Sequence, residues 1–126
     1  MMRTIVAGTA LAAASAFIET IKANSVRVLS LDTAGEAIAA LSAGGFDLLV
    51  AAEDLGDMSG LELIEAVVKS SPMLNCAVVS SLSPEDYHEA SEGLGILMQL
   101  PPDPGPEEAV ALVNHLKKIR SFGVGP

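Results

Sequence analysis

The sequence has little of four features that often indicate a function: cysteine, aromatic side chains, basic side chains and long apolar runs. Cys76 is the only cysteine in 126 residues, so the chain can form no internal disulfide, which is typical of a reducing compartment. No apolar run reaches the roughly 18 residues that a membrane-spanning helix needs. Seven basic residues stand against sixteen acidic ones, and this net charge of −9 argues against direct binding to nucleic acid or to an anionic membrane. We therefore expect a cytoplasmic protein.

Half of the residues are hydrophobic but only 3% are aromatic, so alanine and the aliphatic residues must supply most of the core. Small aliphatic layers of this kind are typical of helices that pack on a parallel sheet. The length of 126 residues fits one domain, which we place at residues 1–121, with 122–126 as a tail. We expect Cys76 to belong to the core of this domain.

The first seventeen residues, MMRTIVAGTALAAASAF, allow two interpretations. An apolar run that ends in Ala14-Ser15-Ala16 is similar to a secretory signal peptide with its cleavage site. Against this, Arg3 is the only basic residue, and Gly8-Thr9 interrupts the run where a strand would turn into a helix. Apolar residues also continue at helical period across the supposed cleavage site, through Phe17 and beyond. We favour a first strand followed by a helix.

Strands and helices alternate along the whole chain. The predicted strands cover residues 3–7, 26–31, 46–51, 76–80 and 96–100, and the predicted helices cover 9–23, 34–43, 61–70, 84–92 and 106–120. Thr9 is the predicted N-cap of the first helix, and Ser83-Pro84 is a cap followed by proline at the first helical position of the fourth. Sequential strand–helix units form a parallel sheet, and five units are too few for a closed barrel. We therefore expect an open, doubly wound sheet with its site at the carboxyl ends of the strands.

Several motifs in this order resemble the receiver domain of two-component response regulators. The stretch from Asp47-Leu48-Leu49-Val50 to Gly60-Leu61-Glu62-Leu63 is similar to the family's phosphoacceptor strand, loop and helix start. Glu36-Ala37-Ile38, Pro101 and Asp103 with Glu107-Glu108 extend the resemblance over essentially the whole chain. The resemblance implies a three-layer, flavodoxin-like α/β fold with a five-stranded parallel sheet in the order 2-1-3-4-5. It also implies a role in phosphorelay signal transduction.

The reactive positions of the family are mostly lost. Receivers bind Mg²⁺ through two acids after the first strand and the phosphoacceptor aspartate, and they carry a hydroxyl residue after strand 4 and a lysine after strand 5. The matching positions here are Ala7, Gly8, Ala52, Ser80 and Leu100. Only Ser80 keeps its chemistry, whereas aspartyl phosphorylation needs a carboxylate nucleophile and a divalent cation held by oxygen ligands. The resemblance therefore implies a degenerate pseudo-receiver that is not an enzyme and has no metal or cofactor.

Alternatives for this region remain open. Asp54 could accept a phosphoryl group in a divergent receiver, although this assignment breaks the family's spacing to Gly60. Glu53 could mimic a phosphorylated aspartate, although it falls one position late and points to the other face of an extended strand. The simplest interpretation of Glu53, Asp54 and Asp57 is a solvated loop whose acids precede a helix N-terminus. Ser80 either binds an anion or, more simply, caps its strand end.

We expect the domain to act by binding other proteins or a second copy of itself. The family's output face would here include Tyr87, Leu97, Gln99 and His115. Acidic residues of the fourth helix form either a solvated face or a docking site for a basic partner; they are Glu85, Asp86, Glu89 and Glu92.

Two further ligand classes can be weighed from the residues. His88 and His115 lie far apart in sequence without neighbouring ligands, so we expect no metal site. A small molecule could instead bind in the vacated pocket, which would lie beside Ala7, Gly8, Ala52 and Ser80.

Overall fold

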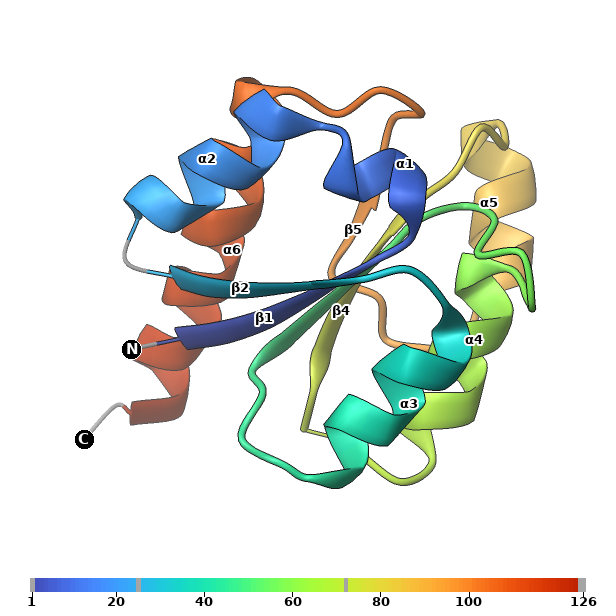
Figure 1. Ribbon diagram of the computed structural model, residues 1–126, viewed down its shortest axis with the longest axis horizontal. Helices are drawn as coiled ribbons and strands as arrows, with labels where there is room; N and C mark the ends of the chain where they lie inside the picture. Colours follow the sequence, from blue (N-terminus) through green and yellow to red (C-terminus); the bar gives the residue numbers. More distant parts are fainter. Residues whose placement is uncertain (1, 25, 72, 125–126) are drawn as a thin grey trace.

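The computed structural model describes residues 2–24, 26–71 and 73–124, and its centre is one parallel β-sheet (Figure 1). The five strands are β1 (Met2–Ala7), β2 (Val26–Leu31), β3 (Leu48–Ala51), β4 (Asn75–Val79) and β5 (Met98–Leu100). All neighbouring strands pair in parallel, in the order β2-β1-β3-β4-β5. The predicted fold class and strand order are confirmed.

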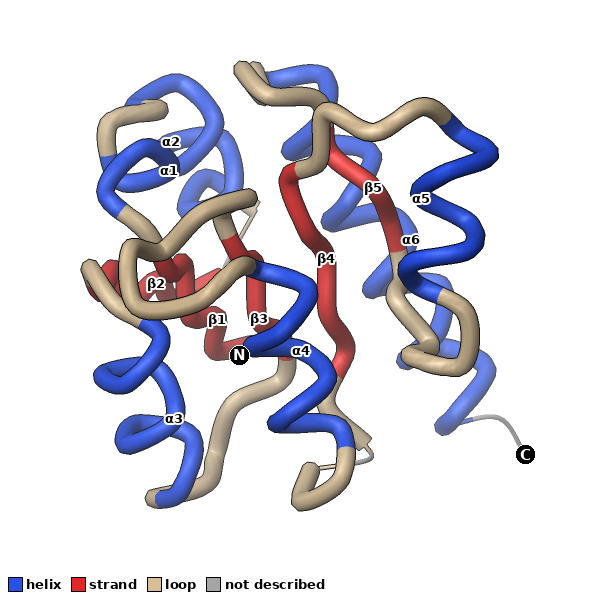
Figure 2. Tube along the Cα trace, turned by 90° about the vertical axis from the view of Figure 1, so that its right-hand side faces the viewer, coloured by secondary structure: helices blue, strands red, loops and turns tan. Residues whose placement is uncertain are grey.

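Six helices are described, and they cover both faces of the sheet. They are α1 (Thr9–Ala12), α2 (Ser15–Ala23), α3 (Ala34–Ser42), α4 (Gly60–Val68), α5 (Pro84–Ser91) and α6 (Pro106–Val124). Figures 1 and 2 show α2 and α6 together on one face, and α3, α4 and α5 on the other. This is the doubly wound, three-layer arrangement expected from the alternation of strands and helices. No helix in the described part of the chain is long and apolar enough to cross a lipid bilayer.

The two central strands are buried on both sides. Every residue of β3 is buried, as are the last four residues of β1, and their small or branched aliphatic side chains fill the layer between the helices. Cys76 at the base of β4 is also in the core, and burial raises the pKa of its thiol to about 12. The cysteine was predicted to be a core residue, and this is confirmed.

Three of the helices begin at hydroxyl side chains. Thr33 and Ser59 form reciprocal capping boxes with Glu36 and Glu62 at the starts of α3 and α4. Ser83 accepts a hydrogen bond from the backbone N–H of Asp86, and proline follows at the first position of α5, as predicted. These caps fix where the loops after β2, β3 and β4 end.

The first predicted helix, 9–23, is wrong as a single element. The chain forms α1 and α2 instead, with a break at Ala14, whose ψ of 69° is not helical. Thr9 does not act as N-cap either; Gly8 takes that position and makes no side-chain bond. Leu11 and Phe17 are both buried on either side of the break, so the apolar period continues across it and hides it in the sequence.

The last helix is longer than predicted. It runs to Val124, beyond the expected end at residue 120, and so enters the segment expected to be a tail. The last two residues of that tail, 125 and 126, lie outside the described residues.

Candidate functional site

The positions that match the family's reactive residues meet at the carboxyl edge of the sheet. Backbone hydrogen bonds connect them: Ala52 N donates to Ala7 O at 2.9 Å, and Ser80 N donates to Leu100 O at 3.0 Å. Gly8 N donates to Leu31 O at 2.8 Å. The five positions are Ala7, Gly8, Ala52, Ser80 and Leu100, and all are buried. The sheet therefore brings together the residues that the sequence singled out.

Gly8 and Ala52 fit against each other so closely that neither position has spare room. Gly8 has a φ of 113°, a left-handed backbone conformation that favours glycine. A Cβ atom at Gly8 would overlap the Cβ of Ala52 and would lie 3.1 Å from Cδ2 of Leu55. A carboxylate side chain at position 8 is thus excluded unless the backbone moves.

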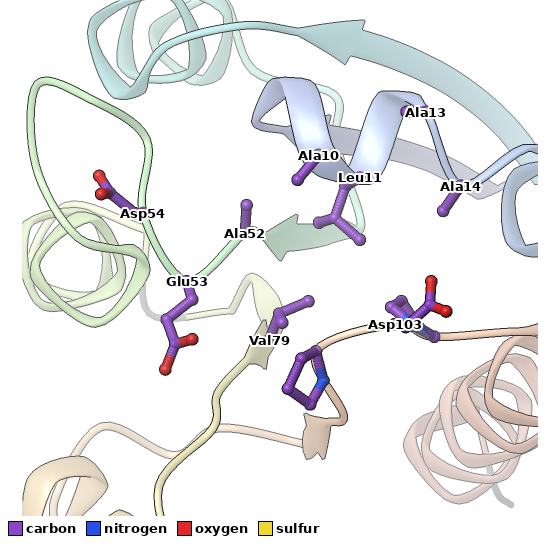
Figure 3. A pocket seen from close by; sticks show the side chains of 11 residues that line it. Ala10, Leu11, Ala13, Ala14, Ala52, Glu53, Asp54, Val79 and Asp103 are labelled. Atoms are coloured by element: carbon purple, nitrogen blue, oxygen red, sulfur yellow. The ribbon is translucent and has the colours of Figure 1, made fainter.

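The residues at this edge do not fit a bound Mg²⁺ ion. Ala7, Gly8 and Ala52 offer no side-chain oxygen, and Mg²⁺ needs hard oxygen ligands in near-octahedral geometry. Asp54, the nearby alternative, accepts a hydrogen bond from Gly56 N at 2.8 Å, and its carboxylate points away from Ala52 (Figure 3). Within residues 2–24, 26–71 and 73–124, no group of three or more His, Cys, Asp or Glu side chains could hold a metal ion.

Glu53 connects two loops at this edge. Its Oε2 atom accepts hydrogen bonds from Ser81 N at 2.7 Å and from Ser81 Oγ at 2.8 Å. Glu53 is exposed, as expected of a loop acid, but its carboxylate also holds the start of the β4–α5 loop. This contact could not be predicted from local patterns, because the two residues are 28 positions apart.

The residues around Ser81, the 80–82 loop, are also held from β5. Gln99 Nε2 donates to Ser80 O at 3.3 Å and to Leu82 O at 3.2 Å. Ser80 Oγ accepts from Leu82 N at 3.1 Å, which is the capping role expected of it. Together with Glu53, these bonds hold the 80–82 loop to the β3–α4 loop and to β5.

Asp57 anchors the other side of the acidic loop, through a contact with α3 that the sequence did not suggest. Its two carboxylate oxygens accept from Ala34 N and Gly35 N, each at 3.0 Å, at the start of α3. These bonds lower the pKa of Asp57 below its usual value, and the bond from Gly35 N has the largest effect. Asp57 precedes the N-terminus of α4, as expected, but its carboxylate binds the start of α3.

Replacing Asp57 by alanine is expected to lower the melting temperature at pH 7 by a few degrees, because two N–H groups of α3 lose their acceptor. The pKa of Asp57 in the native state lies below the unfolded value of 3.8. The stabilisation by its carboxylate is therefore complete above pH 3.8 and is lost as the pH falls through the native pKa. Thermal melts of both proteins from pH 7 to pH 2.5 would measure it. Asp103→Ala, which removes an exposed carboxylate elsewhere, is the control; a constant difference at all pH values would contradict this role.

A cavity of about 340 Å³ opens beside Ala52 (Figure 3). Its lining residues come from the α1–α2 break, the β3–α4 loop, the end of β4 and the segment after β5; they are Ala10, Leu11, Ala13, Ala14, Ala52, Glu53, Asp54, Val79, Pro102, Asp103 and Pro104. The pocket that the sequence suggested is placed differently, because of its four residues only Ala52 lines this cavity. Ala7, Gly8 and Ser80 are buried and do not line it.

The predicted interaction face lies along the β5 edge of the sheet, between α5 and α6 (Figure 2). Tyr87, Leu97 and Gln99 are half-buried and His115 is exposed. Helix α5 buries none of its residues, and its acidic side chains are exposed. Beside its start, Leu82 is 38% exposed and lines a groove of about 450 Å³ with Pro84, Gln99 and others.

Comparisons with known proteins agree with this architecture. No protein-family model and no curated protein matches the sequence. Among solved structures, a response regulator receiver domain protein from Methanospirillum hungatei superimposes with a TM-score of 0.82 at 20% identity, over 97% of this chain and 98% of that one. A Francisella response regulator receiver domain gives 0.82 at 19% identity, over 95% and 99%. The chemotaxis response regulator CheY4 of Vibrio cholerae gives 0.80 at 15% identity, over 92% and 98%. The chain therefore has the receiver fold of two-component response regulators.

Proposed function

We propose that this protein is a receiver-like domain of a two-component signalling system that acts by protein–protein interaction and without phosphorylation. The observation that carries the proposal is the contact between Gly8 and Ala52, which fills the space where a metal ligand and a phosphoacceptor would otherwise meet. In this proposal the domain is not an enzyme, needs no cofactor and works in the cytoplasm.

The chemistry of the carboxyl edge supports this proposal. Phosphoryl transfer to a carboxylate needs a nucleophile, a divalent cation and positive charge around the phosphoryl oxygens. Alanine at 52, glycine at 8 and leucine at 100 supply none of these. Asp54 is a poor substitute, because its carboxylate is engaged with Gly56 N and points away from the edge.

The fixed 80–82 loop suggests how such a domain works. A phosphorylated receiver would have to reposition this segment, whereas here the carboxylate of Glu53 already binds Ser81 N and Oγ. The protein then has one signalling conformation, and its output depends on partner binding, oligomerisation or abundance and not on a population shift driven by a phosphoryl group.

We place the partner site on the face formed by Tyr87, Leu97, Gln99 and His115. The neighbouring helix α5 buries no residue and exposes Glu85, Asp86 and Glu89, so a basic protein surface complements it. A second copy of the same chain is the other candidate partner for this face. Such a dimer would have to form through the groove beside Leu82, because the acidic side chains of two α5 helices would repel each other.

The decisive experiment is incubation of the whole chain with acetyl phosphate and Mg²⁺, followed by intact-mass measurement. We expect no phosphoryl adduct under conditions in which a receiver with an intact aspartate is labelled. An adduct that disappears in Asp54→Asn would overturn the proposal and assign Asp54 as a divergent phosphoacceptor. An adduct that survives in Asp54→Asn would overturn it as well and would place the acceptor elsewhere.

A small-molecule-binding role is the second candidate function. The cavity beside Ala52 favours it, because its volume lies in the range of small-ligand sites.

A further inference from the structure

Most of the residues that line the cavity beside Ala52 are apolar, and the polar ones are three acids. The region around the break between α1 and α2 contributes the methyl groups of Ala10, Ala13 and Ala14, and Val79, Pro102 and Pro104 complete the apolar part of the lining. The alanine side chains are too short to fill this space. One continuous helix in place of α1 and α2 would have placed these alanines differently. A volume of about 340 Å³ is enough for a small ring or a short branched chain.

Three acids lie at the rim of this cavity, and the carboxylates of two of them accept hydrogen bonds from the protein. Glu53 binds Ser81, and Asp54 binds Gly56 N. Asp103 makes no hydrogen bond or ion pair with any described residue. In Figure 3 its carboxylate lies beside Ala14, across the cavity from Ala52. No basic side chain lines the cavity among the described residues.

From this arrangement we propose that the cavity binds a small organic ammonium compound with an apolar body. The body would displace water from the alanine and proline surface, and the ammonium group would pair with the Asp103 carboxylate at the rim. Negative charge at the rim and a net charge of −9 attract cations to this site and oppose anions. We therefore expect carboxylate and phosphate compounds to bind more weakly than amines of the same shape.

Three probes of the same shape but different charge test the site: benzylamine, benzyl alcohol and benzoate. Each is titrated into the isotope-labelled whole chain while amide chemical shifts are recorded by NMR. We expect benzylamine to shift the amides of Ala10, Ala13, Ala14 and Asp103 saturably, with a dissociation constant in the millimolar range that suits so small a compound. Benzyl alcohol should bind about fivefold to tenfold more weakly, and benzoate should not bind.

Two variants separate the roles of charge and cavity. Asp103→Asn should weaken benzylamine about fivefold to tenfold and leave benzyl alcohol unchanged. Ala13→Leu places a larger side chain at an exposed lining position, where folding tolerates it, and should abolish binding of both. Glu65→Gln removes an exposed acid on α4 that does not line the cavity, and should change neither.

The inference is overturned if benzylamine causes no saturable shift, if benzoate binds as well as benzylamine, or if Asp103→Asn keeps full affinity for the amine. It does not depend on the absence of phosphorylation, so its failure would leave the proposed function standing. Labelling by acetyl phosphate would likewise leave the amine site standing.

Discussion

Ala52→Asp is expected to destabilise the fold by about 3 kcal/mol at pH 7, and it should not create a phosphoacceptor. Ala52 is 3% exposed, and its Cβ faces Gly8 at the crowded carboxyl edge. A carboxylate there would lose water without gaining a cation, since leucine stands at position 100 and no basic side chain lines the adjoining cavity in the described chain. Ala7 and Gly8 at the neighbouring strand end supply no carboxylate, so an aspartate at position 52 would have no side-chain partner there with which to hold Mg²⁺.

The cost of Ala52→Asp should depend on pH in a defined direction. Burial raises the pKa of the new carboxyl above its unfolded value, so the native state binds more protons than the unfolded state between the two values. The deficit relative to the parent is therefore full above the raised native pKa. It shrinks as the pH falls toward the unfolded value near 4.

Urea denaturation of parent and variant at pH 7 and pH 4.5 would measure this deficit, and intact mass after acetyl phosphate treatment would test labelling. Ala52→Asn is the matched control, because it adds a side chain of similar size without a charge. Its cost should be smaller and independent of pH. A stable Ala52→Asp protein that accepts a phosphoryl group would show that the edge can still bind the metal.

Gly60→Ala is expected to cost about 2–4 kcal/mol, although alanine is normally the better helix former. A Cβ atom at Gly60 would overlap the carbonyl oxygen of Ala52 and would lie 2.9 Å from Cγ2 of Val78. No rotamer change can relieve the first contact, because it is with backbone. The position is also held in place, since Gly60 N donates to Glu53 O at 3.0 Å.

The control for Gly60→Ala is Gly35→Ala, which makes the same change in the first turn of α3. A Cβ atom at Gly35 would meet nothing nearer than Asp57 Oδ2 at 3.6 Å, so this variant should be neutral or slightly more stable. Urea midpoints of the three proteins give the comparison. Equal effects of the two substitutions would show that helix propensity, and not the close approach to Ala52, decides the result.

The layers of this fold could be predicted because they depend on local patterns. Continuous aliphatic runs such as Leu48–Ala51 indicate strands buried on both faces, and hydroxyl residues before proline or an acid, as at Ser83-Pro84, indicate where helices begin. The alternation of strands and helices along the chain then leaves few possible topologies. The positions at the carboxyl edge followed from the same order of elements and from the resemblance to receivers.

What could not be predicted depends on contacts between residues far apart in the chain. Glu53 and Asp57 read as loop acids, but their partners are Ser81 and the start of α3, which only the folded sheet brings near. The break at Ala14 is hidden for a different reason. Alanine has a strong intrinsic preference for helix, and packing overrides it there.

Gly8 follows β1 and Ala52 follows β3, more than forty residues later in the chain, yet each limits the size of the side chain that fits at the other. An acid introduced at one of them meets a neighbour that leaves no room for it. Any effort to convert this protein into a chemically switchable one would therefore have to remodel both strand ends and their surroundings in one step. Successive single substitutions would pass through intermediates that fold less well than the starting protein.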